Sequence, residues 1–77
     1  MSDLSNLIKG KDLSLYPVIG GYQLIDDRRN SYVFISAEDL HEPDPARVVF
    51  SYDGYTYELH ESKKGKYRLY SCRSVWA

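Results

Sequence analysis

Apolar and polar residues alternate on both sides of an Asp-Gly pair, and this is the clearest structural signal in the chain. Asp53-Gly54 favours a two-residue type I′ turn, because glycine accepts positive φ freely and aspartate tolerates it. The turn pairs Tyr52 with Tyr55 and predicts a β-hairpin over residues 47–62 in one register. One face of this hairpin is wholly apolar or aromatic: Val48, Phe50, Tyr52, Tyr55, Tyr57 and Leu59.

A helical pattern precedes the strands. Leu4, Leu7 and Ile8 lie on one stripe of a helix, which predicts a short helix over residues 2–9. Ser2 or Asp3 is the candidate for its N-cap. Two helical turns are unstable alone, so we expect this helix to dock on the sheet as a lid over the core.

The segment between the helix and the hairpin contains two clear strand patterns. Residues 11–20 are predicted to be an extended connector, because Pro17 does not suit a central strand. Strands are predicted over residues 21–26 and 31–36, and the second is apolar at both parities, which suggests cover on both faces. Residues 37–46 are predicted to be an acidic loop with one helical turn at its start.

The final strand, residues 67–76, can pair with the hairpin in two registers. An even-length loop puts one set of side chains on the core side: Tyr70, Cys72, Ser74 and Trp76. A three-residue loop with a bulge puts another set there: Tyr67, Leu69, Ser71 and Val75. We favour the even loop, because it buries Trp76 and sets Arg68 opposite Glu61.

Five strands in hairpin order and one short helix predict a mainly β, single domain over residues 1–77, with the hairpins in residues 21–77. Strands of about six residues fit a strongly curved antiparallel sheet, closed like a small SH3 or OB barrel. An α+β sheet with the helix on one face is the alternative. A core of this size supplies only about 3–5 kcal/mol of net stability.

The composition narrows the cellular setting. Cys72 is the single cysteine, which excludes an internal disulfide and fits a reducing compartment. No apolar run approaches the roughly 20 residues of a membrane span. The first residues lack the basic and apolar regions of a signal peptide. We therefore expect a soluble, cytoplasmic protein that does not bind a membrane.

The formal charge of −1 is unevenly distributed. Residues 1–62 carry all 11 acidic residues and five basic ones, whereas residues 63–77 carry five basic residues and no acidic one. The basic end can steer an anionic partner, or it can neutralise acidic strands that lie beside it. We favour neutralisation.

Residues that could support catalysis or hold a metal ion do not form a recognisable motif. A nucleophile needs a positioned base, but Cys72 and His60 lie on opposite faces in the even register, and no third residue orients the histidine. His41 stands in an acidic loop without EF-hand spacing or the cysteine pairs of a zinc site. We therefore expect a protein that is not an enzyme and that uses no metal or cofactor.

Eight tyrosines in 77 residues exceed what so small a core can bury. Tyrosine is favoured at protein interfaces, because it combines a large rigid area with a polar tip. Exposed tyrosines and the acidic loop together predict a protein-binding patch. Its candidate residues are Tyr22, Tyr32, Glu38, Asp39, Glu42 and Tyr55.

The basic and aromatic final strand predicts an alternative, the binding of single-stranded nucleic acid. Bases stack on aromatic rings, and lysine or arginine contacts phosphate. The candidate contacts are Lys63, Lys64, Lys66, Tyr67 and Arg68. The chain as a whole is weakly acidic and carries no RNA-binding signature, so protein binding is the favoured hypothesis.

In general form the chain resembles the small stand-alone proteins of phages and other mobile elements. The resemblance is one of size and style, and no motif carries it. Such proteins often act stoichiometrically, by occluding or mimicking a surface of a host enzyme or defence complex. We expect a small regulator or inhibitor, monomeric or homodimeric, with a protein partner. A subunit that self-assembles through an exposed edge strand is a third hypothesis.

Overall fold

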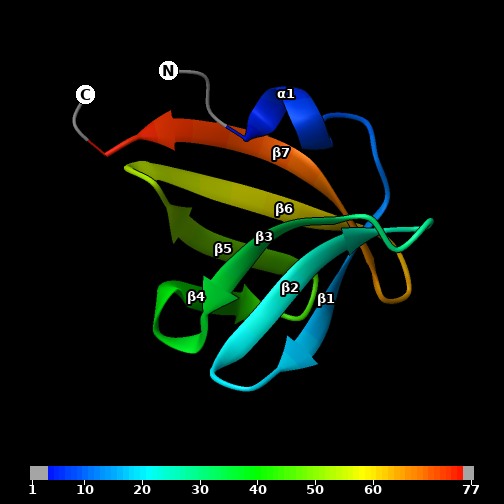
Figure 1. The fold of residues 1–77 in the computed structure, drawn as a ribbon. Coiled ribbons are helices and arrows are strands. Elements are labelled where there is room, and N and C mark those ends of the chain that lie inside the picture. The colour runs from blue at the N-terminus through cyan, green and yellow to red at the C-terminus, as the bar shows by residue number, and fades with distance from the viewer. Residues whose placement is uncertain (1–3, 76–77) are drawn as a thin grey trace.

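Seven strands form one antiparallel sheet in the computed structural model, which describes residues 4–75 (Figure 1). The strand order is β3-β2-β1-β7-β6-β5-β4. The elements are α1 (Ser5–Ile8), β1 (Leu13–Val18), β2 (Gly21–Asp26), β3 (Ser31–Ser36), the 3₁₀ helix η1 (Ala37–Asp39), β4 (Leu40–Asp44), β5 (Arg47–Tyr52), β6 (Tyr55–Lys63) and β7 (Lys66–Ser74). The antiparallel, mainly β prediction is confirmed, but the prediction of five strands is wrong.

The first additional strand, β1, occupies the segment predicted to be a connector. It pairs with β2 along its whole length, from Leu13 opposite Asp26 to Val18 opposite Gly21. On its other side β1 pairs with β7 at Leu13 alone. At Pro17, β1 therefore pairs with β2 only, and within residues 4–75 the side of the strand away from β2 has no partner strand. The lack of an N–H group in proline costs no ladder hydrogen bond on that unpaired side.

The second additional strand, β4, occupies most of the predicted acidic loop. The helical turn expected at its start is present as η1, and the Ser36 hydroxyl accepts a hydrogen bond from the Glu38 N–H group at 3.4 Å. The chain then extends, and Leu40 pairs with Phe50 in β5. Pro43 lies in β4, which is an edge strand, at the irregular part of the ladder between His41 and Asp44, where a missing N–H group is tolerated.

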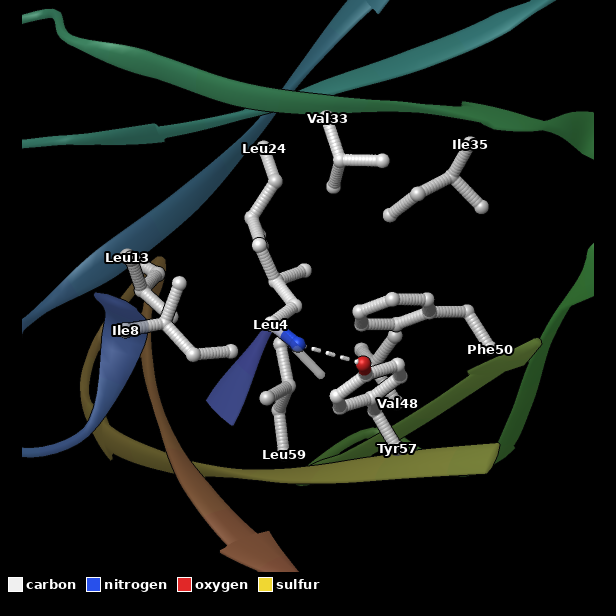
Figure 2. Close-up of a cluster of buried hydrophobic side chains, with 10 residues drawn as sticks. All are labelled: Leu4, Ile8, Leu13, Leu24, Val33, Ile35, Val48, Phe50, Tyr57 and Leu59. Atoms are coloured by element: carbon white, nitrogen blue, oxygen red, sulfur yellow. Dashed lines mark hydrogen bonds between the residues drawn. The ribbon is translucent and has the colours of Figure 1, made fainter. Parts of the chain in front are cut away.

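The sheet curves strongly but does not close. β3 and β4 stand at its two ends, so an SH3-like or OB-like barrel is not confirmed. Curvature brings β2 and β3 over β5 and β6, and the buried side chains lie between these two halves (Figure 2). The buried cluster consists of Leu4, Ile8, Leu13, Leu24, Val33, Ile35, Val48, Phe50, Tyr57 and Leu59.

The helix α1 lies beside β7 and closes one side of this core (Figure 1). Leu4 and Ile8 are buried, whereas Leu7 is 57% exposed, so the expected stripe of three apolar contacts is wrong at Leu7. The N–H group of Leu4, the N-cap residue of α1, donates to the Tyr57 hydroxyl at 2.8 Å. The helix predicted over residues 2–9 is shorter, Ser5–Ile8, and its N-cap is Leu4, so the prediction of a cap at Ser2 or Asp3 is wrong.

The Asp-Gly hairpin has the predicted register in full, from Tyr52 opposite Tyr55 to Val48 opposite Leu59. Asp53 and Gly54 have φ values of 51° and 83°, as a type I′ turn requires. Four of the six predicted inner side chains are fully buried: Val48, Phe50, Tyr57 and Leu59. The remaining two, at the turn end, are more exposed.

The β6–β7 ladder uses both predicted registers in succession. The turn itself closes as in the even register, with Lys63 opposite Lys66. After an irregularity, His60 pairs with Arg68 and Leu59 with Leu69, as in the bulged register. Beyond a second irregularity Tyr57 pairs with Cys72, as in the even register. Arg68 is therefore not opposite Glu61, and the preference for the even loop holds for only part of the strand. The predicted burial of Trp76 lies outside the described residues.

β3 is covered on one face only. Val33 and Ile35 are buried, but Phe34 points to the other side and is 43% exposed. The expected cover on both faces is therefore wrong, because α1 packs beside β7. Within residues 4–75 no helix is long and apolar enough to cross a membrane.

Candidate functional site

An open groove lies between the β5–β6 turn and the edge strand β3. Its volume is about 280 Å³. The lining residues come from β3, η1, the hairpin and the end of β7: Phe34, Ser36, Asp39, Ser51, Tyr52, Asp53, Gly54, Tyr55 and Val75. The groove is therefore built from segments that are far apart in the sequence.

The aromatic wall of the groove is an extension of the core. Tyr52 and Tyr55 form the last pair before the turn, on the hairpin face that is buried further along. The Tyr55 ring lies 6.4 Å from the Tyr57 ring, and Tyr57 is fully buried. Tyr52 is 41% exposed, so part of its ring is open to a partner. Aromatic side chains anchored in this way lose little entropy on binding.

Acidic side chains stand at the rim of the groove. Asp39 comes from η1 and Asp53 from the hairpin turn, and both residues are exposed. Neither forms an ion pair within residues 4–75, and none of the described lining residues is basic. The groove therefore combines an apolar aromatic wall with uncompensated negative charge.

Two of the six residues predicted for protein binding line the groove. Asp39 and Tyr55 line the groove, and Glu38 is exposed beside Asp39 in η1. Glu42 is exposed on β4. Tyr22 is half-buried in β2, where it pairs with Pro17 and Ile35.

Tyr32, the sixth of these residues, has a structural contact. Its hydroxyl donates to Asp26 Oδ2 at 2.8 Å, and Asp26 also accepts hydrogen bonds from the Asn30 side chain and from the Arg28 and Asn30 N–H groups. Burial acts to raise the pKa of Asp26, but these hydrogen bonds outweigh it and hold the pKa well below its usual range. The Asp26 carboxylate therefore organises the β2–β3 turn.

The basic residues of the final strand connect the two halves of the sheet. Arg68 Nε lies 2.7 Å from Asp12 Oδ1, and Lys63 Nζ lies 3.8 Å from Asp12 Oδ2. Lys66 Nζ lies 2.7 Å from Asp27 Oδ1. The hydrogen bond from Arg68 is the main cause that lowers the pKa of Asp12. These ion pairs lie where β1 and β7 are joined by a single residue pair.

The other two candidates for nucleic-acid contact differ in exposure. Lys64 is exposed at the β6–β7 turn. Tyr67 is half-buried against the core, and burial raises the pKa of its hydroxyl. A ring packed against the core offers less surface for stacking on a base than a freely exposed ring does.

The histidine and cysteine of the hairpin region lie on opposite faces. Cys72 packs against the core opposite Tyr57, whereas His60 Nε2 contacts Glu58 Oε2 at 2.6 Å on the other face. Tyr70, the extra residue at the bulge, stacks on the His60 ring at a centroid distance of 3.9 Å. The structure therefore does not bring the thiol and the imidazole together.

In the described part of the chain no three His, Cys, Asp or Glu side chains gather closely enough to hold a metal ion.

Sequence reasoning missed several groove residues, among them the partly exposed aromatic residues Phe34 and Tyr52. A usable signal was present. The hairpin register puts Tyr52 at the open end of an apolar face. Phe34 gave no such signal, because its strand was expected to be covered on both faces. Comparisons with protein-family models, with curated proteins and with solved structures find no match for this chain.

Proposed function

We propose that this protein is a non-catalytic, protein-binding regulator or inhibitor that acts stoichiometrically on its partner. The observation that supports this proposal best is the groove in which Phe34, Tyr52 and Tyr55 stand beside Asp39 and Asp53. Rigid aromatic anchors with a polar rim are characteristic of protein interfaces. The uncompensated acidic rim favours a partner segment with basic side chains.

The ion pairs of the final strand favour protein binding over nucleic-acid binding. Three of the four candidate cations, Lys63, Lys66 and Arg68, lie next to Asp12 or Asp27. A phosphate backbone would have to compete with these carboxylates for the same cations. Single-strand binding through this strand is therefore the alternative, and the experiment below distinguishes the two.

The test is capture of a partner from a lysate of the source cells with the purified chain as bait, with and without nuclease. The recovered protein is then titrated directly with the wild-type chain and with Tyr52→Ala. We expect a stoichiometric, nuclease-resistant protein whose affinity falls at least about tenfold with Tyr52→Ala. A charge-neutral change, Asp53→Asn, should weaken binding while preserving the turn, because asparagine also tolerates positive φ.

Tyr16→Ala is the matched control, because Tyr16 is 54% exposed on β1 and does not line the groove. We expect it to bind as the wild type does. Loss of binding with Tyr16→Ala but not with Tyr52→Ala would place the interface elsewhere and contradict the groove proposal. Recovery that disappears with nuclease, and that falls steeply with salt, would support the nucleic-acid alternative instead.

A further inference from the structure

The two edge strands of the sheet differ in how they are protected. β4 carries Pro43 and two acidic residues, and its ladder with β5 is irregular, all of which discourage pairing with another strand. β3 has the sequence Ser-Tyr-Val-Phe-Ile-Ser, without proline or charge. An uncharged edge of high β propensity is a template for a further strand.

The backbone groups of β3 that point outward can be assigned from the ladder. The Ala37 N–H group donates to the Gly20 carbonyl oxygen at 3.0 Å, which makes Ser36 and Gly21 a non-hydrogen-bonded pair. Alternation then directs the N–H and C=O groups of Ser36 and Phe34 away from β2. The Phe34 side chain is 43% exposed beside these groups.

Charged residues of opposite sign flank β3. Arg28 and Arg29 precede the strand, and Glu38 and Asp39 follow it. All four are exposed, and none of them forms an ion pair with another of the described residues. The edge is therefore neutral along the strand, positive at its beginning and negative at its end.

A second copy of this chain complements that charge pattern. We propose that the protein forms a two-fold symmetric dimer by antiparallel pairing of the β3 edges. A register centred on Phe34 pairs this residue with its own copy through its two outward groups, and sets Ser36 opposite Tyr32 of the second copy. In this antiparallel arrangement the end of β3 that follows Arg28 and Arg29 lies beside the end of the other copy that precedes Glu38 and Asp39, at both ends of the pair. Parallel pairing would instead place like charges together.

The dimer also buries aromatic area that the single chain exposes. The two Phe34 rings lie side by side on the same face of the joined sheet, where cross-strand aromatic pairs stabilise. Phe34 and Ser36 also line the groove, so dimerisation competes with binding of a partner there. The dimer proposal does not depend on the proposed function, because it is tested by the molar mass of the chain in solution and not by the binding of another protein.

The test measures the molar mass of the full chain by sedimentation equilibrium from about 5 to about 500 µM. We expect the mass to rise with concentration from 8.9 kDa toward twice that value. R28E/R29E and E38K/D39K should each weaken self-association at least tenfold, because each homodimer then pairs like charges. An equimolar mixture of the two variants should restore a dimer, because both ends again pair opposite charges. Lys9→Glu, a charge reversal at an exposed residue that follows α1, is the control and should dimerise normally.

Ser36→Pro tests the backbone pairing separately. Ser36 has φ −61°, which proline adopts, and its N–H group points to the free edge, so the fold should be kept while the dimer is lost. Circular dichroism verifies the fold of every variant. The proposal is overturned if the wild-type chain stays at 8.9 kDa at all concentrations, if the charge-reversed mixture fails to associate, or if folded Ser36→Pro still dimerises.

Discussion

The hydrogen bond between Leu4 and Tyr57 makes a direct test of how the helix is attached to the sheet. The Leu4 N–H group donates to the Tyr57 hydroxyl at 2.8 Å, inside the core (Figure 2). Tyr57 is fully buried and Leu4 is 7% exposed. Tyr57→Phe removes the hydroxyl and keeps the ring, whose centroid lies 5.0 Å from that of Phe50. The change therefore separates the contribution of the hydroxyl from the packing of the ring.

Loss of this bond leaves a buried N–H group without its acceptor, which costs about 1–3 kcal/mol. A domain of this size has only about 3–5 kcal/mol in total. The variant should therefore lose a large part of its free energy of unfolding, and its Tm should fall by about 4–8 °C for each kcal/mol lost. Hydrogen exchange of the α1 amides should accelerate more than that of the β5–β6 ladder.

The assay is urea unfolding followed by circular dichroism, with Tyr52→Phe as the control. Tyr52 is 41% exposed, so removal of its hydroxyl should change the free energy of unfolding very little. A Tyr57→Phe variant within about 0.5 kcal/mol of the wild type would refute the reasoning. That result would mean that water reaches Leu4 and that the helix is held by side-chain packing alone.

Two further predictions concern the β2–β3 pair and the charged face of the hairpin. In Gly21→Ala the new Cβ would overlap the Ile35 carbonyl oxygen, so β2 and β3 must separate locally. We expect the free energy of unfolding to fall by about 1–3 kcal/mol, measured as a lower urea midpoint. An unchanged midpoint would contradict the close approach of the two strands. The hydrogen bond from His60 is the main cause that holds the pKa of Glu58 below its usual range. A carboxyl group whose pKa is lower in the folded state than in the unfolded state stabilises the fold at pH values above the unfolded pKa. This stabilisation is lost as the pH falls through the folded pKa. The urea midpoint should therefore stay level from about pH 7 to about pH 5 and should decrease at lower pH. Glu58→Gln should make this decrease smaller. A wild-type midpoint that is equal at about pH 6 and about pH 3 would count against the contribution of Glu58.

Local sequence was sufficient wherever one turn and its neighbouring residues decide the structure. The Asp53-Gly54 turn sets the hairpin register, because its backbone conformation allows one closure and the alternation of side chains agrees with it. Ser36 capping a short helical turn follows from the same kind of local chemistry. The apolar residues of β2 and β3, bounded by turn residues, likewise predicted both strands within their observed bounds.

Local rules failed at the two prolines inside strands. Pro17 and Pro43 argue against a strand only if both sides of that strand are paired. β1 is paired on one side only beyond Leu13, and β4 is an edge strand. Within the described residues, each proline therefore lies in a part of its strand that has no partner on one side. The position of a strand within a sheet is a property of its neighbours, and the residues of the strand do not reveal it.

The β6–β7 register and the candidate surfaces were decided by tertiary structure alone. Leu69 and Cys72 belong to different predicted registers, and irregularities in the ladder let both pack against the core. The groove joins Phe34, Asp39 and Tyr52 because curvature of the sheet brings β3 over the hairpin. The sequence by itself thus determined turns, alternation and most strands, which depend on neighbouring residues. The fold decided which edges stay open and which side chains meet, because both depend on how the whole sheet bends around its core.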